Sequence, residues 1–101
     1  MVIREWRAVA EPGSVQGYRQ HFHSKVLPQL RQIAGFAGAH LAQRRRDDAI
    51  ELLVLTRWQS LDAIRAFAGD DPEVAIVEPE AAAVLIAFDG HVRHYDVIEE
   101  A

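Results

Sequence analysis

Residues 50–58 read IELLVLTRW, a β-rich run whose middle is apolar at both alternating positions. A strand with one face in water should instead alternate apolar and polar side chains. This run therefore predicts a strand in a sheet that is covered on both faces. A single layer of helices covers only one face, so the other face has to be closed by a second molecule. We expect a homodimer.

Three other segments have the composition of strands. Residues 2–9 carry apolar side chains at both parities, and residues 37–45 lead into Arg46-Asp47-Asp48, a polar break that suits a hairpin turn before residues 49–58. Residues 88–98 are β-rich again, but Asp89-Gly90 interrupts them and predicts a turn or a bulge before the last strand.

Helices are predicted between these strands. Ser14 is a good N-cap for an amphipathic helix that ends before Gly35, and Pro28 predicts that this helix bends or restarts there. Ser60 caps a second helix that stops at Gly69. A brief helix is expected after Asp71-Pro72 and through residue 77, and Glu78-Pro79-Glu80 opens a last one.

The order strand, helix, strand, strand, helices, strand predicts an α+β sandwich. We expect one domain over residues 1–101, with a four-stranded antiparallel sheet and helices on one face. The composition is that of an ordinary globular protein, with 50% hydrophobic and 26% charged residues. A chain of this length buries only about two-thirds of its unfolded surface, so a partner subunit would help it.

Composition also excludes several classes of function. There is no cysteine, which excludes disulfides, thiolate metal sites and a cysteine nucleophile. The net charge of −4 argues against nucleic acid as a partner. No stretch approaches the roughly 20 apolar residues that span a bilayer, so we expect a cytoplasmic protein without a membrane partner.

Histidines are the first candidates for chemistry, but their spacing argues against a metal site. His21 and His23 point in different directions on a helix and, with His40, are interpreted as surface residues. His91 and His94 are three residues apart on a strand and face opposite sides. His94, with Val92 as an apolar neighbour on the same face, is either a core histidine with a satisfied partner or a group that moves protons or orients a ligand.

The aromatic residues are spread over every element, as a core requires. Trp6 and Trp58 near strand ends, together with Tyr18 on the covering helix, could also wall a cleft for a flat apolar ligand. Arg4 shares a strand face with Trp6. We expect it to form a salt bridge across the sheet, with an anionic oxygen of a ligand as the alternative.

Several motifs taken together resemble the antibiotic biosynthesis monooxygenase domain family of the dimeric α/β barrel superfamily. The most specific part is residues 58–69, WQSLDAIRAFAG, followed by residues 75–81, AIVEPEA, and by His94-Tyr95; Trp6, Tyr18, Pro28, Gly35-Phe36 and Asp96-Val97 also fit. The resemblance spans nearly the whole chain. It implies a ferredoxin-like fold and a homodimeric α/β barrel in which two sheets face each other.

The resemblance further implies a cofactor-independent monooxygenase that acts with dioxygen on a small aromatic, phenolic or quinone-like molecule. His94 is then expected to act as a base or an orienting group, with Trp58 and Tyr18 as hydrogen-bond donors to a developing oxyanion. Trp6 and Phe67 would wall the site, and Arg4, Phe22 and Phe88 would also contact the substrate.

Two other functions remain open. One is a non-catalytic protein, ligand-binding or stress-related, with the same dimeric fold. A pocket on the order of several hundred Å³ lined by Trp6, Trp58 and His94 would favour the enzyme, and a filled core would favour the binding protein. The other is heme binding through His91 or His94. The heme-degrading branch of the family that the chain resembles typically uses an asparagine in the first strand and a histidine in the broken helical stretch as its iron ligand. Here the first strand has no asparagine and residues 69–86 have no histidine, so the resemblance disfavours canonical heme degradation.

Overall fold

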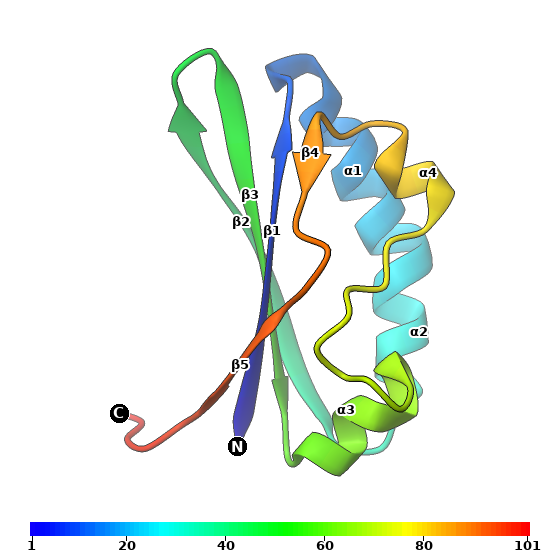
Figure 1. The fold of residues 1–101 in the computed structure, drawn as a ribbon, viewed down its shortest axis with the longest axis vertical. Helices are drawn as coiled ribbons and strands as arrows, with labels where there is room; N and C mark the ends of the chain where they lie inside the picture. The colour runs from blue at the N-terminus through cyan, green and yellow to red at the C-terminus, as the bar shows by residue number, and fades with distance from the viewer.

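The computed structural model describes all residues, 1–101. Its elements along the chain are β1 (Val2–Ala10), a 3-10 turn (Pro12–Ser14), α1 (Val15–His21), a π-helical turn (Phe22–Val26), α2 (Leu27–Arg31), β2 (Phe36–Arg46), β3 (Ala49–Trp58), α3 (Leu61–Ala68), α4 (Pro79–Ala82), β4 (Ala87–Phe88) and β5 (Arg93–Asp96). All helices lie on the same side of the sheet (Figure 1). The predicted α+β sandwich is therefore confirmed. No helix is both long and apolar enough to cross a membrane.

The sheet is antiparallel, with the order β2-β3-β1, and both β4 and β5 pair with the free edge of β1. Five strands thus fill four positions. Between the pairs Ala8↔Phe88 and Glu5↔Arg93, β1 has two residues and the partner segment has four. The partner segment therefore has two extra residues. Because side chains alternate with a period of two, this insertion does not change which residues face the helices: even-numbered side chains do so in β5 as in β4. His94, opposite Arg4, therefore faces the helices.

The first helical stretch restarts next to Pro28, as predicted. The N–H of Leu27 donates to the carbonyl of Phe22, five residues back, which closes a π-helical turn. Pro28 then lies in the first turn of α2, directly after the π-helical turn, where the missing N–H of proline interrupts the regular helical hydrogen bonding. Such π-turns absorb irregularities within helices without ending them.

The helix predicted after Asp71-Pro72 and through residue 77 is wrong. Residues 70–78 are an extended loop, in which the N–H of Ala75 donates to Gly90 (2.9 Å) and the N–H of Val92 donates to Glu73 (2.8 Å). The physical reason is that prolines at positions 72 and 79 leave few residues between them, several of which are β-branched. Their backbone groups find partners in residues 90–92 instead of in a helix.

The core lies between the sheet and the helices. Even-numbered residues of β1 and β3 point into it, and the largest fully buried side chains are Trp58, Leu30, Leu52 and Ile64. At the end of α2, Gly35 has a φ of +94°, and a Cβ there would lie 2.6 Å from the Cβ of Ala63. Glycine at this position lets the chain leave the helix and pass closely against α3.

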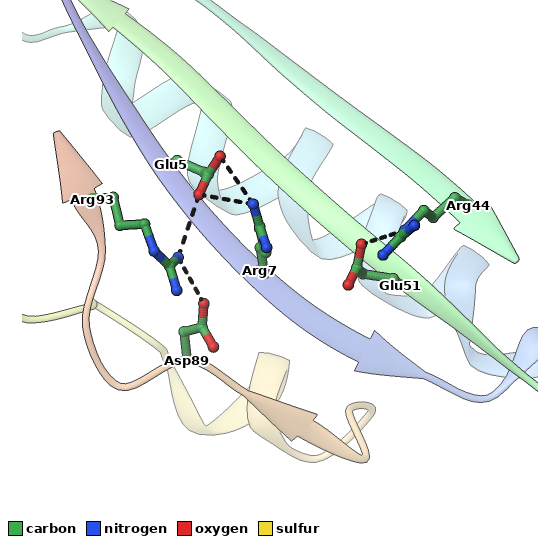
Figure 2. Close-up of polar contacts among 6 residues, drawn as sticks. All are labelled: Glu5, Arg7, Arg44, Glu51, Asp89 and Arg93. Atoms are coloured by element: carbon green, nitrogen blue, oxygen red, sulfur yellow. Dashed lines mark hydrogen bonds and ion pairs between the residues drawn. The ribbon is translucent and has the colours of Figure 1, made fainter. Parts of the chain in front are cut away.

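No part of the chain covers the other side of the sheet, which we term the open sheet face. Its apolar side chains are those of Ile3, Val9, Leu53, Leu55 and Tyr95. Most of its charged side chains form ion pairs (Figure 2): Glu5 with Arg7 (3.4 Å) and Arg93 (3.3 Å), Asp89 with Arg93 (3.3 Å), and Glu51 with Arg44 (2.7 Å). Arg57, opposite Ile3, makes no ion pair: its guanidinium donates to the carbonyl of Ala37 (3.5 Å) and its Nε is buried without a partner. The face is thus largely apolar, with one partly buried cation that has no acidic partner within the chain.

Candidate functional site

A small cavity of about 70 Å³ lies between the helices and the sheet. Twelve of its 17 lining residues are hydrophobic. β1 contributes Arg4 and Trp6, the first helical stretch contributes Tyr18 and Phe22, and α3 contributes Phe67. Residues 75–78 of the extended loop close another wall. The site is therefore an enclosed, mainly apolar space with a few polar groups, which is typical of small-molecule sites.

The aromatic walls of the cavity are packed and held in place. The rings of Trp6 and Tyr18 lie 5.9 Å apart, and those of Tyr18 and Phe22 lie 6.4 Å apart. The indole N–H of Trp6 donates to the carbonyl of Asp89 at 2.8 Å, which fixes the ring. Asp89 belongs to the irregular segment between β4 and β5, so that interruption helps to position the site.

Tyr18 brings a polar group to this apolar wall. The residue is only 5% exposed, and its hydroxyl makes no hydrogen bond within the chain. Burial raises the pKa of Tyr18 well above that of an exposed tyrosine. The hydroxyl therefore stays protonated at neutral pH and can donate a hydrogen bond to a molecule in the cavity.

Arg4 is the one positively charged side chain of the core. It is 5% exposed and makes no ion pair, so the salt bridge expected across the sheet is wrong. Its guanidinium donates instead to the carbonyls of Pro72 and Val74 (3.2 Å for Val74) and lies 5.9 Å from the ring of Phe67. Burial lowers the pKa of Arg4 to about 10, which still leaves the group charged at neutral pH.

His94 does not line the cavity and lies behind Arg4. Its Nε2 is 3.0 Å from Nη1 of Arg4. A guanidinium has only donors, so Nε2 accepts this hydrogen bond and the imidazole is neutral with its hydrogen on Nδ1. Burial, together with the charge of Arg4, lowers the pKa of His94, which agrees with a neutral ring.

Five of the eight predicted site residues line the cavity: Arg4, Trp6, Tyr18, Phe22 and Phe67. His94, Trp58 and Phe88 do not. Trp58 is fully buried in a second core cluster, and its indole N–H donates to the hydroxyl of Thr56 at 2.8 Å. Phe88 is 42% exposed and lies near Trp6, with ring centres 6.3 Å apart and the ring planes tilted by 42°.

Sequence reasoning missed His21 and the loop of residues 75–78. His21, interpreted as a surface residue, has a side chain only 9% exposed that lines the cavity, with Nδ1 3.7 Å from the carboxylate of Glu80. Its spacing of three from Tyr18 was a usable signal, because such residues share a helix face. The loop left no comparable signal, since its position depends on pairing with residues 90–92.

One family model matches most of the sequence. The sequence model described as antibiotic biosynthesis monooxygenase matches residues 1–79. No curated protein has a matching sequence.

Several solved structures share the fold. Rv0793 from Mycobacterium tuberculosis is 17% identical, with a TM-score of 0.66 and 99% of this chain and 97% of that chain covered. The heme-degrader MhuD from the same organism, solved with two hemes in its active site, is 20% identical (TM-score 0.67; 100% and 99% covered). A monooxygenase from the gene ActVA-Orf6 of Streptomyces coelicolor, in complex with Nanaomycin D, is 16% identical (TM-score 0.62; 99% and 92% covered). At these identities the likeness concerns the fold.

Proposed function

The chain belongs to the antibiotic biosynthesis monooxygenase family, and on that premise we propose that it is a cofactor-independent monooxygenase of a small phenolic or quinone-like aromatic molecule. The pocket expected for an enzyme, on the order of several hundred Å³ and lined by Trp6, Trp58 and His94, is not found, because the cavity is smaller and only Trp6 of the three lines it. The observation that carries this proposal is instead the chemistry of the lining. It joins aromatic walls to a buried, protonated hydroxyl on Tyr18 that has no partner in the chain.

The chemistry that fits this site takes its electrons from the substrate. A phenol loses its proton to the imidazole of His21, which lines the cavity, and the phenolate gives one electron to dioxygen. The resulting radical pair recombines at a ring carbon as a peroxide, which takes that proton back to become a hydroperoxide. Loss of water then leaves a quinone, so one phenol and one dioxygen give one quinone and one water. The protein has to hold the ring, stabilise the oxyanion and exclude bulk water.

The residues divide these tasks by position. Tyr18 donates to the substrate oxygen, and Trp6, Phe22 and Phe67 hold the ring. His94, whose Nε2 lone pair is already engaged by Arg4, orients that guanidinium rather than acting as the base. Trp58 and Phe88 support the cavity walls from outside.

Substrate entry requires a movement of the loop. The cavity of about 70 Å³ is smaller than the pockets of about 300–1,000 Å³ that hold ligands of drug size. Residues 70–78 form the wall best suited to move, because Ile76 is 51% exposed and the segment is extended. The non-catalytic alternative would use the same cavity for binding alone.

The structure offers no support for heme binding through His91 or His94. Neither residue lines the cavity, and the imidazole nitrogen of His94 that faces inward accepts a hydrogen bond from Arg4. His21 is the histidine of the lining, and its Nδ1 lies 3.7 Å from the carboxylate of Glu80. We therefore propose no heme site.

We also propose that two copies of the chain pair through the open sheet face. The helices leave Ile3, Leu53 and Leu55 without cover, and most charged residues of this face have partners within the chain. A second copy can therefore cover the apolar side chains, and Arg57 is the charge that would take a partner from across the interface.

Oxygen uptake tests the proposed activity. Protein treated with a chelator and free of flavin absorbance is mixed with naphthols and dihydroxynaphthalenes in ¹⁸O₂, with a blank lacking protein. We expect protein-dependent uptake with label in the quinone. Tyr18→Phe should lower kcat by about 100-fold, the cost typical of losing one oxyanion donor.

Tyr95→Phe is the matched control, because Tyr95 is 49% exposed and points away from the cavity. It should leave kcat unchanged. Ligand binding without uptake across the panel would support the non-catalytic alternative instead. Equal rates for Tyr18→Phe and the parent protein would remove Tyr18 from the site.

A further inference from the structure

We infer that the cavity selects a substrate that is already an anion at neutral pH, an aromatic carboxylate, and that Arg4 is the residue that binds it. This goes one step beyond the proposed function, on which it rests, because a neutral phenol would satisfy that function equally well.

The first reason is the uncompensated charge of Arg4. Arg4 is only 5% exposed to solvent, and none of the six ion pairs of the chain includes it. Buried charges in proteins are nearly always paired, because removing an ion from water is costly. Two carbonyls and an imidazole solvate the guanidinium, but all three are neutral.

The second reason is the number of donors that remain. Nη1 serves Pro72 and His94, and Nη2 serves Val74 with one hydrogen. The Nε–H and one Nη2–H make no hydrogen bond within the chain. A guanidinium binds a carboxylate through two parallel N–H groups, and here two N–H groups are free for it.

The third reason is where this side chain lies. Arg4 is part of the cavity lining and neighbours Trp6 on the same face of β1, so a ring held by Trp6 would place a substituent within the reach of Arg4. Glu78 is the acidic residue of the lining, and it makes no ion pair with Arg4. The cavity therefore offers a positive charge that makes no ion pair within the chain.

The test compares benzoate with benzamide, which have nearly the same shape and differ in charge. Binding is followed at pH 7.5 by the indole N–H signals in ¹H–¹⁵N NMR spectra, with Trp6 in the cavity and Trp58 outside it as an internal reference. We expect the Trp6 signal to shift, the Trp58 signal to stay nearly constant, and benzoate to bind at least about tenfold more tightly than benzamide.

Arg4→Met should abolish this preference, so that benzoate and benzamide bind with about equal affinity, whereas Arg4→Lys should keep part of the preference. Arg31→Met is the matched control, because it removes the same charge from an exposed position on α2 that has no ion pair. Its preference should equal that of the parent protein. The comparison of benzoate with benzamide in the parent protein needs no variant. It therefore tests the preference for an anion even if Arg4→Met fails to fold.

Equal affinity for benzoate and benzamide in the parent protein would overturn the anion inference and leave the proposed oxygenase intact. A preference that survives in Arg4→Met would overturn the role of Arg4. Failure of both compounds to shift Trp6 would contradict the cavity as a binding site, and with it this inference and the proposed function together.

Discussion

Replacing Leu55 by aspartate is expected to convert the protein from a dimer into a monomer. Leu55 lies on the open sheet face of β3, between Glu5 on β1 and His40 on β2. In the proposed dimer an aspartate there would lose its hydration next to Glu5, at a cost of several kcal/mol for each copy that Arg57, two residues along the same face, offsets only in part. Sedimentation velocity should show twice 11.3 kDa for the parent protein and 11.3 kDa for Leu55→Asp.

Leu61→Asp is the control for a general effect of the substitution. Leu61 is 37% exposed at the first turn of α3, away from the open sheet face, and an acidic residue suits that position of a helix. This variant should remain a dimer. If the parent protein is itself a monomer at micromolar concentration, the open sheet face is not a dimer interface and the proposal of a homodimer fails.

Trp58→Ala is expected to be the most destabilising single truncation, with a loss of about 3–5 kcal/mol in the free energy of unfolding. The indole is fully buried between Phe36 and Phe67, with ring centres 5.3 and 6.1 Å away. Its removal leaves a large void and strands the hydroxyl of Thr56. Urea unfolding followed by circular dichroism, at one fixed protein concentration, measures the change.

Two variants separate the causes of that loss. Trp58→Phe keeps a ring but removes the N–H donor, so it should cost about 1–3 kcal/mol. Ile98→Ala, at a position that is 96% exposed, should change stability by less than about 0.5 kcal/mol. A loss below about 1 kcal/mol for Trp58→Ala would show that this indole is not a core anchor and would reopen its assignment to a catalytic role.

The sheet could be predicted from the sequence because its signals are local. The β-rich apolar run of residues 49–58 and the polar break at residues 46–48 place the hairpin, and in the structure β2 ends at Arg46 and β3 begins at Ala49. Asp47 takes a φ of 53°, a conformation that aspartate tolerates in tight turns. Pro28 likewise marks the helical restart through chemistry confined to its own turn.

The site could be predicted only in part, because its decisive contacts join distant parts of the chain. Trp6, Tyr18 and Phe22 follow from the inward faces of one strand and one helix. The partners of Arg4, by contrast, are Pro72, Val74 and His94, which lie 68 to 90 residues further along. No periodicity encodes these contacts. The helix wrongly predicted for residues 71–77 also gave no reason to expect their carbonyls to accept hydrogen bonds from Arg4.

A crystal structure of the protein with 1-naphthol tests most directly whether this cavity is the substrate site. The ring is predicted to lie against Trp6 and Phe22, with its oxygen within hydrogen-bond distance of the Tyr18 hydroxyl and residues 70–78 displaced to make room. A ring bound on the open sheet face, with the cavity still closed by its own side chains, would contradict the account.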